Sequence, residues 1–84
     1  MNYTVDWLPE AEIALADAWL QAADPGAVTT AQAQIDRLLA RDPIGKGQHL
    51  HEGLCQIVVN PLTAFYSVDA VARRVEVSQV WYTP

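Results

Sequence analysis

The first residues of the chain alternate between apolar and polar side chains. Tyr3, Val5 and Trp7 are separated by single polar residues, which is the period of two expected of a half-buried strand. Residues 9–23 are rich in alanine and begin with proline, which suits the first turn of a helix. Apolar residues recur there at helical spacing and predict a helix with a broad apolar face. One stripe of this face is Ile13, Ala16, Leu20 and Ala23, and its neighbour is Leu15, Trp19 and Ala22.

A second helix is predicted to begin at Asp24-Pro25, because aspartate is a strong N-cap and proline fits the first helical position. Apolar residues keep a spacing of three and four up to Asp42-Pro43, where this helix should end. Only a few residues separate the two helices, so they should form an antiparallel hairpin. Residues 43–48 contain two glycines and a proline and are predicted to form an exposed, mobile loop.

The remaining residues are typical of strands. Three β-rich runs at 54–59, 63–68 and 75–81 are joined by short turns, which predicts an antiparallel meander. In the last run, alternation from Val75 places Trp81 in the core and Tyr82 on the opposite face. The order strand, helical hairpin and three strands predicts an α+β fold, with one sheet and two helices packed on one of its faces. One domain should span residues 1–84.

Composition supports a globular domain. Half of the 84 residues are hydrophobic, so a core is expected without a structural metal or other cofactor. Cys55 is the single cysteine and cannot form an internal disulfide, which favours a reducing compartment and predicts a cytoplasmic location. No apolar run approaches the roughly 18 residues of a membrane span, and the first residues have no signal-peptide pattern.

The charge is strongly asymmetric. Ten acidic and five basic residues give a net charge of −5, and every lysine and arginine lies between Arg37 and Arg74. Binding to nucleic acid through counterion release requires clustered cations. Arg73 and Arg74 are the only adjacent pair, so the charge balance argues against a phosphate-binding protein.

The element order and five segments together resemble the RelE/ParE family of toxins from type II toxin–antitoxin systems, which includes plasmid stabilisation proteins. The resemblance covers nearly the whole chain. It implies a toxin neutralised by a cognate antitoxin, usually through an amphipathic helix and an extended segment. Members of the family either cleave mRNA on the ribosome or inhibit DNA gyrase. The five segments are residues 5–12 (VDWLPEAE), 35–43 (IDRLLARDP), 53–57 (GLCQI), 64–69 (AFYSVD) and 75–81 (VEVSQVW).

The two activities make different physical demands. RNA cleavage without a metal requires an acid, a base and cations over the phosphate. The resemblance implies lysines and arginines on the central strands, but here the corresponding positions are Gln56, Val58 and Thr63. Tyr82 stands where a catalytic tyrosine would be, although an isolated tyrosine more often packs against a core. The sequence therefore favours a ParE-like toxin that acts through protein contact, with gyrase as an open target and the ribosome or mRNA disfavoured.

Two histidines offer further chemistry. His49, His51 and Cys55 would share one face of a regular strand, and all three can bind zinc. A second ligand pair at a recognised spacing is missing, so an exposed polar strand is favoured over a metal site. Alternatively, His49 and His51 could join Tyr82 as the acid–base groups of an atypical RelE-like endonuclease.

Several residues are candidates for partner binding. Arg73 and Arg74 could contact an acidic antitoxin, or they could belong to a solvated hairpin loop. The sheet face without helices, expected to bear Tyr66 or Tyr82, is the predicted docking area for an antitoxin. A protein that has this fold but has lost toxicity is a third hypothesis, and a homodimer stays open.

Overall fold

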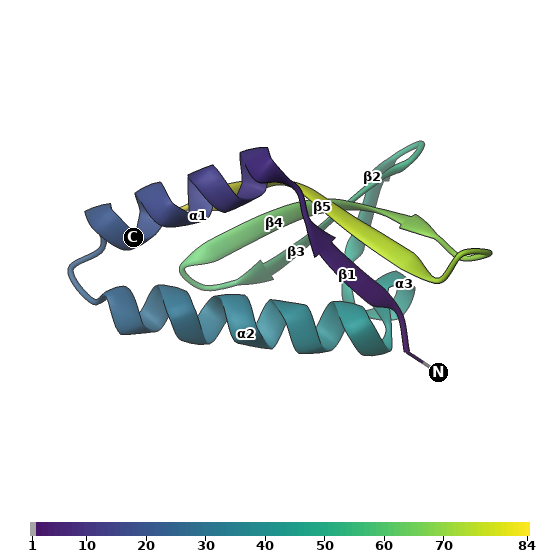
Figure 1. The fold of residues 1–84 in the computed structure, drawn as a ribbon, viewed down its shortest axis with the longest axis horizontal. Helices are drawn as coiled ribbons and strands as arrows, with labels where there is room; N and C mark the ends of the chain where they lie inside the picture. Colours follow the sequence, from purple (N-terminus) through teal and green to yellow (C-terminus); the bar gives the residue numbers. More distant parts are fainter. Residues whose placement is uncertain (1) are drawn as a thin grey trace.

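A five-stranded sheet with two long helices on one face makes up the fold (Figure 1). The computed structural model describes residues 2–84. Strand β1 runs parallel to β5, the other neighbours are antiparallel, and the order across the sheet is β1-β5-β4-β3-β2. The elements are β1 (Thr4–Trp7), α1 (Pro9–Gln21), α2 (Pro25–Arg41), α3 (Pro43–Lys46), β2 (Gln48–His51), β3 (Leu54–Val59), β4 (Leu62–Asp69) and β5 (Arg74–Tyr82). The α+β prediction is confirmed.

The segment between α2 and β3 differs from its prediction as a mobile loop. It forms the short helix α3 and the strand β2, so the meander has four strands instead of three. The Asp42 side chain accepts a hydrogen bond of 2.9 Å from the Gly45 N–H and caps α3. Asp42-Pro43 therefore ends one helix and begins the next. Strand β2 is exposed along its whole length, which explains why it shows no apolar alternation.

Helix α1 packs through its small residues. Ala11 and Ala18 are buried, whereas Ile13 is 65% exposed and Leu20 74% exposed. The predicted stripe of Ile13 and Leu20 therefore points to solvent, because the alanine face allows α1 to lie closer to β5. Helix α2 follows its prediction. The core comprises Ala11, Ala18, Val28, Ala31, Ile35, Leu39, Ile57, Leu62, Ala64, Tyr66, Val75, Val77 and Val80. Within residues 2–84, no helix is long and apolar enough to cross a membrane.

A β-bulge reverses the faces of the last strand. Phe65 pairs with Gln79 and Tyr66 pairs with Val77, so Ser78 is an extra residue in β5. One extra residue moves every following side chain to the other face of the sheet. Trp81 is consequently 59% exposed on the face away from the helices, and Tyr82 packs partly buried against the core. The predicted faces of Trp81 and Tyr82 are thus wrong.

Tyr66 ties α3 to the sheet from inside the core. It was expected on an exposed face, but it is fully buried and its hydroxyl donates a hydrogen bond to the Pro43 carbonyl. Burial, followed by the charges of Cys55 and Asp42, raises the pKa of Tyr66 to about 12. Gly47 passes directly over this hydroxyl. A Cβ atom there would overlap the Tyr66 Oη and lie 2.8 Å from the Gln56 carbonyl oxygen.

This contact predicts a coupled effect on stability. Gly47→Ala should lower the free energy of unfolding by about 2 kcal/mol, because the added methyl group overpacks the site. Tyr66→Phe should lower it by about 1–3 kcal/mol, because the buried Pro43 carbonyl loses its donor. The double variant should lose less than the sum, because the hydroxyl that the methyl group meets has gone. Urea unfolding of the four proteins measures this, and additive losses would contradict the contact.

Candidate functional site

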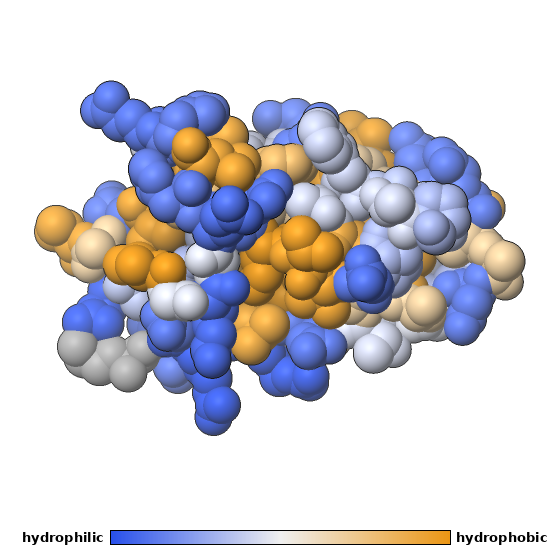
Figure 2. All heavy atoms as spheres, turned by 180° about the vertical axis from the view of Figure 1, so that it is seen from behind, coloured by the Kyte–Doolittle hydropathy of each residue, from blue (hydrophilic) through white to orange (hydrophobic). Residues whose placement is uncertain are grey.

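The face of the sheet opposite the helices carries an exposed apolar patch. Cross-strand pairing places Val58 beside Thr63, and Thr63 beside Trp81. Phe65, two residues along β4 from Thr63, lies on the same face. We call Val58, Thr63, Phe65 and Trp81 the outer patch. Seen from behind the helices, an apolar area occupies the middle of this face (Figure 2).

An aromatic pair organises the outer patch. The rings of Phe65 and Trp81 meet edge to face, with 4.7 Å between their centroids and 66° between their planes. Such pairs hold each other in place. Val58 is 55% exposed and Trp81 59% exposed, so large apolar groups face solvent in a fixed arrangement. A rigid exposed apolar surface of this kind is typical of protein–protein contacts.

The outer patch is not cationic. Strands β3 and β4 contain no lysine or arginine, and Arg74 is the only one in β5. Arg74 lies at the start of that strand, where its Nε is 3.6 Å from the Asp6 Oδ2. Gln56, Val58 and Thr63, the positions expected to carry cations in a nuclease, share this face. Neutral or apolar side chains therefore occupy the place where a phosphate would need positive charge.

The structure separates the two histidines. The pairing of β2 with β3 is irregular between His49 and His51, so His49 lies opposite Cys55 and His51 lies opposite Leu54. Cys55 and Leu54 point to opposite faces of β3, and so do the histidines. Among residues 2–84, no three histidine, cysteine or acidic side chains come together in a way that could hold a metal ion.

The candidate catalytic residues are not brought together either. Tyr82 pairs with Leu62 at the start of β4, four residues before Tyr66, which pairs with Cys55, the residue opposite His49. Four residues of strand correspond to about 13 Å. Figure 1 accordingly shows the C-terminus and β2 at opposite ends of the molecule. An acid–base site that combines Tyr82 with His49 and His51 does not exist in this arrangement.

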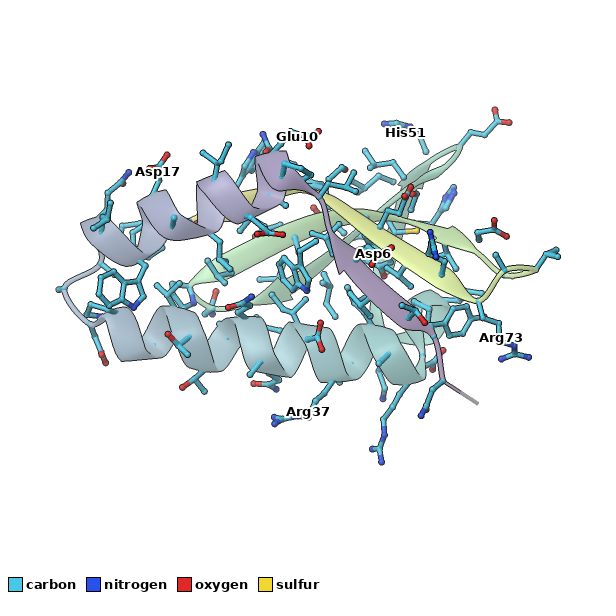
Figure 3. All side chains as sticks on the ribbon, in the orientation of Figure 1. Asp6, Glu10, Asp17, Arg37, His51 and Arg73 are labelled. Atoms are coloured by element: carbon cyan, nitrogen blue, oxygen red, sulfur yellow. The ribbon has the colours of Figure 1, made fainter. Side chains whose placement is uncertain are left out.

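Arg73 and Arg74 contact side chains of the protein itself. The guanidinium carbon of Arg73 lies 5.7 Å from the centroid of the Tyr3 ring, within range of a cation–π interaction. Arg74 pairs with Asp6 and lies opposite Asp69 across the hairpin. Both arginines lie where the β4–β5 hairpin turns, at the first residue of β5 and the residue before it, and Figure 3 shows Arg73 at that end of the molecule.

A second apolar surface, which the sequence did not predict, lies between the two long helices. This α1–α2 groove has a volume of about 390 Å³. Trp7 lies in it, and its indole N–H donates a 2.9 Å hydrogen bond to the Asp36 carboxylate. In the sequence, apolar residues occur around the whole circumference of α1. Because the helix buries only one face against the sheet, this pattern was the signal for a second exposed apolar surface. The lining residues are Trp7, Glu12, Leu15, Ala16, Trp19, Val28, Thr29 and Gln32.

The sequence matches no protein-family model and no curated protein. Solved structures match over nearly its whole length. The toxin–antitoxin complex RelBE2 from Mycobacterium tuberculosis contains a chain of 19% identity with a TM-score of 0.81, and the match covers 98% of this chain and 99% of that one. The fold is that of the RelE/ParE toxins.

Two further structures match this RelE/ParE fold. The chromosomal ParDE toxin–antitoxin system from P. aeruginosa matches with a TM-score of 0.71 and 14% identity, over 98% of this chain and 97% of that one. The archaeal RelE–RelB complex from Pyrococcus horikoshii OT3 also has a TM-score of 0.71, with 12% identity and coverage of 98% and 96%. ParE and RelE types thus both share the backbone. Side chains have to distinguish between them.

The environment of Cys55 predicts low thiol reactivity. Burial raises the pKa of this thiol, so less of the reactive thiolate is present at pH 8 than in the unfolded chain. Iodoacetamide should therefore alkylate Cys55 more slowly in the native protein than in urea at the same pH. Mass spectrometry follows the alkylation rate as the pH is raised. The rate of the native protein should still increase at pH values where the rate of the unfolded chain no longer changes.

Added zinc and a substitution at His49 test the metal hypothesis through the same alkylation rate. An equivalent of zinc should not protect Cys55, and His49→Ala should leave its alkylation rate unchanged. Protection by zinc that depends on His49 would show that the facing pair recruits a metal ion.

Proposed function

We propose that this chain is the toxin of a type II toxin–antitoxin system and acts in a ParE-like manner, through protein contact in the cytoplasm. One observation carries the proposal. On a backbone shared by RelE and ParE toxins, the exposed face of the sheet presents an apolar patch where RNA cleavage would require cations.

The charge that builds up during RNA cleavage disfavours a nuclease. Phosphodiester cleavage accumulates negative charge on the phosphate, and each missing donor to an oxyanion costs about 3 kcal/mol of transition-state stabilisation. Gln56, Val58 and Thr63 supply no positive charge, Arg74 on the same face is paired with Asp6, and Glu76 adds a negative charge there. Several missing donors together would remove most of the rate acceleration. Binding to a protein target, of which DNA gyrase is one candidate, does not require these cations.

The outer patch supplies what a protein contact requires. Exposed tryptophans often dominate binding energy when they become buried at an interface, and Phe65 holds Trp81 in place before any partner arrives. The similar structures RelBE2, ParDE and RelE–RelB are complexes or systems of a toxin with an antitoxin. We propose that a cognate antitoxin covers the outer patch of this chain and so withholds it from the target.

Induced expression in a bacterium tests the proposal. The wild-type chain should arrest growth while the transcript pool stays intact. Trp81→Asp should abolish the arrest, because it places a charge at the centre of the outer patch. Ile13→Asp is the matched control, since Ile13 is similarly exposed on α1, and it should still arrest growth. Growth curves, soluble protein levels and transcript sequencing provide the measurements.

The same cultures separate the alternatives. A change in the supercoiling of a reporter plasmid would identify gyrase as the target. Cleaved messages would contradict the proposal and point to a RelE-like nuclease with an atypical site. Normal growth with abundant wild-type protein would instead favour a chain that keeps the fold without toxicity.

A further inference from the structure

The turn between β4 and β5 carries the most exposed large apolar side chain within residues 2–84. Val71 is 97% exposed, and its neighbours Ala70 and Ala72 also face solvent. Figure 1 shows this turn projecting beyond the ends of the long helices, at the opposite end of the molecule from the C-terminus. A single exposed valine is ordinary on a protein surface. The shape of the turn and the residue that closes it make this valine different.

Hydrogen bonds fix the backbone of the turn from two sides. The Asp69 Oδ1 accepts hydrogen bonds of 3.1 Å from the Val71 N–H and 3.0 Å from the Ala72 N–H. The Arg73 carbonyl accepts a 2.9 Å hydrogen bond from the Thr4 N–H in the N-terminal strand. Val71 is therefore presented on a turn that already has its final shape. A contact made through it costs little conformational entropy.

Arg73 closes the turn in a backbone conformation that favours glycine. Its φ is +54°, in the left-handed region, which costs free energy for a residue with a side chain. The other positive φ within residues 2–84 belongs to Gly53, in the turn between β2 and β3. The chain thus has glycine at one such position and arginine at the other. Residues held in such conformations cluster at functional sites.

The charge of Arg73 is held in place but is not neutralised. Its guanidinium lies 5.7 Å from the centroid of the Tyr3 ring, and Figure 3 shows the side chain projecting from this end of the molecule. Within residues 2–84, the only salt bridge joins Arg74 to Asp6, so Arg73 has no carboxylate partner. One rigid turn therefore presents an apolar side chain and an unpaired cation two residues apart.

We propose that Val71 and Arg73 form a second contact with the protein target, separate from the outer patch. Val71 enters a shallow apolar depression of the target, and Arg73 pairs with a carboxylate at the border of that depression. About 13 Å of strand separates Phe65 of the outer patch from Asp69 at the start of the turn. The proposal rests on the proposed function and adds to it a specific contact and the chemistry of the surface that receives it.

Substitutions at Val71 test the apolar half of the contact by induced expression in a bacterium. Val71→Gln should increase the number of colonies that survive induction at least tenfold over the wild-type chain, because a polar side chain does not enter an apolar depression. Leu20→Gln is the matched control, since Leu20 is an apolar residue of α1 that is 74% exposed. This control should arrest growth like the wild-type chain.

Arg73→Gly separates function from stability. Its midpoint of urea unfolding should stay close to that of the wild-type chain, because relief of the left-handed backbone offsets the lost contact with Tyr3. Survival after induction should nevertheless rise at least tenfold. Arg73→Lys keeps the charge and should retain more of the growth arrest than Arg73→Gly. A purely structural role would instead link the growth arrest of each variant to its unfolding midpoint.

The outcomes distinguish this proposal from the proposed function. If the wild-type chain arrests growth and Trp81→Asp abolishes the arrest, full arrest by Val71→Gln and Arg73→Gly would overturn the second contact alone. Relief by Arg73→Gly without relief by Val71→Gln would indicate binding of a polyanion such as nucleic acid, and it would also overturn the proposal. A wild-type chain that does not arrest growth would overturn both.

Discussion

The pairing of β4 with β5 decides which side chains of this protein reach solvent. These strands form the centre of the sheet, and the extra residue Ser78 divides β5 into two halves of opposite facing. Before the bulge, Val75 and Val77 enter the core; after it, Val80 does. The bulge also turns Trp81 outward against Phe65. Without that single residue, the outer patch would lose its tryptophan and the core would have to accommodate an indole.

Helix α1 contacts the sheet through alanines, and this affects both its buried face and its exposed face. A smooth face brings the helix close to β5, so few large side chains are needed beneath it. The larger apolar residues, such as Ile13 and Trp19, are left at the surface. A small domain has little interior to fill. The molecule therefore has two separate apolar surfaces, one on the sheet and one between the helices.

Charge determines which partners these surfaces can accept. Toxins that share this backbone can differ completely in chemistry, because fold alone does not specify activity. Here the outer patch is neutral and apolar, and the groove is apolar with an acidic rim. Neither surface attracts a phosphate backbone, and both suit a protein. The net charge of −5 adds a long-range preference for basic partners.

The sequence by itself determined what depends on neighbouring residues: the cap at Asp24, the end of α2 at Asp42, the apolar stripe of α2, the turns after β3 and β4, and the absence of cations from β3 and β4. Local spacing and backbone chemistry specify these features. Only the tertiary structure decided the rest. The burial of Tyr66, the outward turn of Trp81 and the side of α1 that packs all depend on contacts between distant segments. For Trp81 the deciding contact is the bulge in β5, and no local pattern indicates which residue of a strand will be extra.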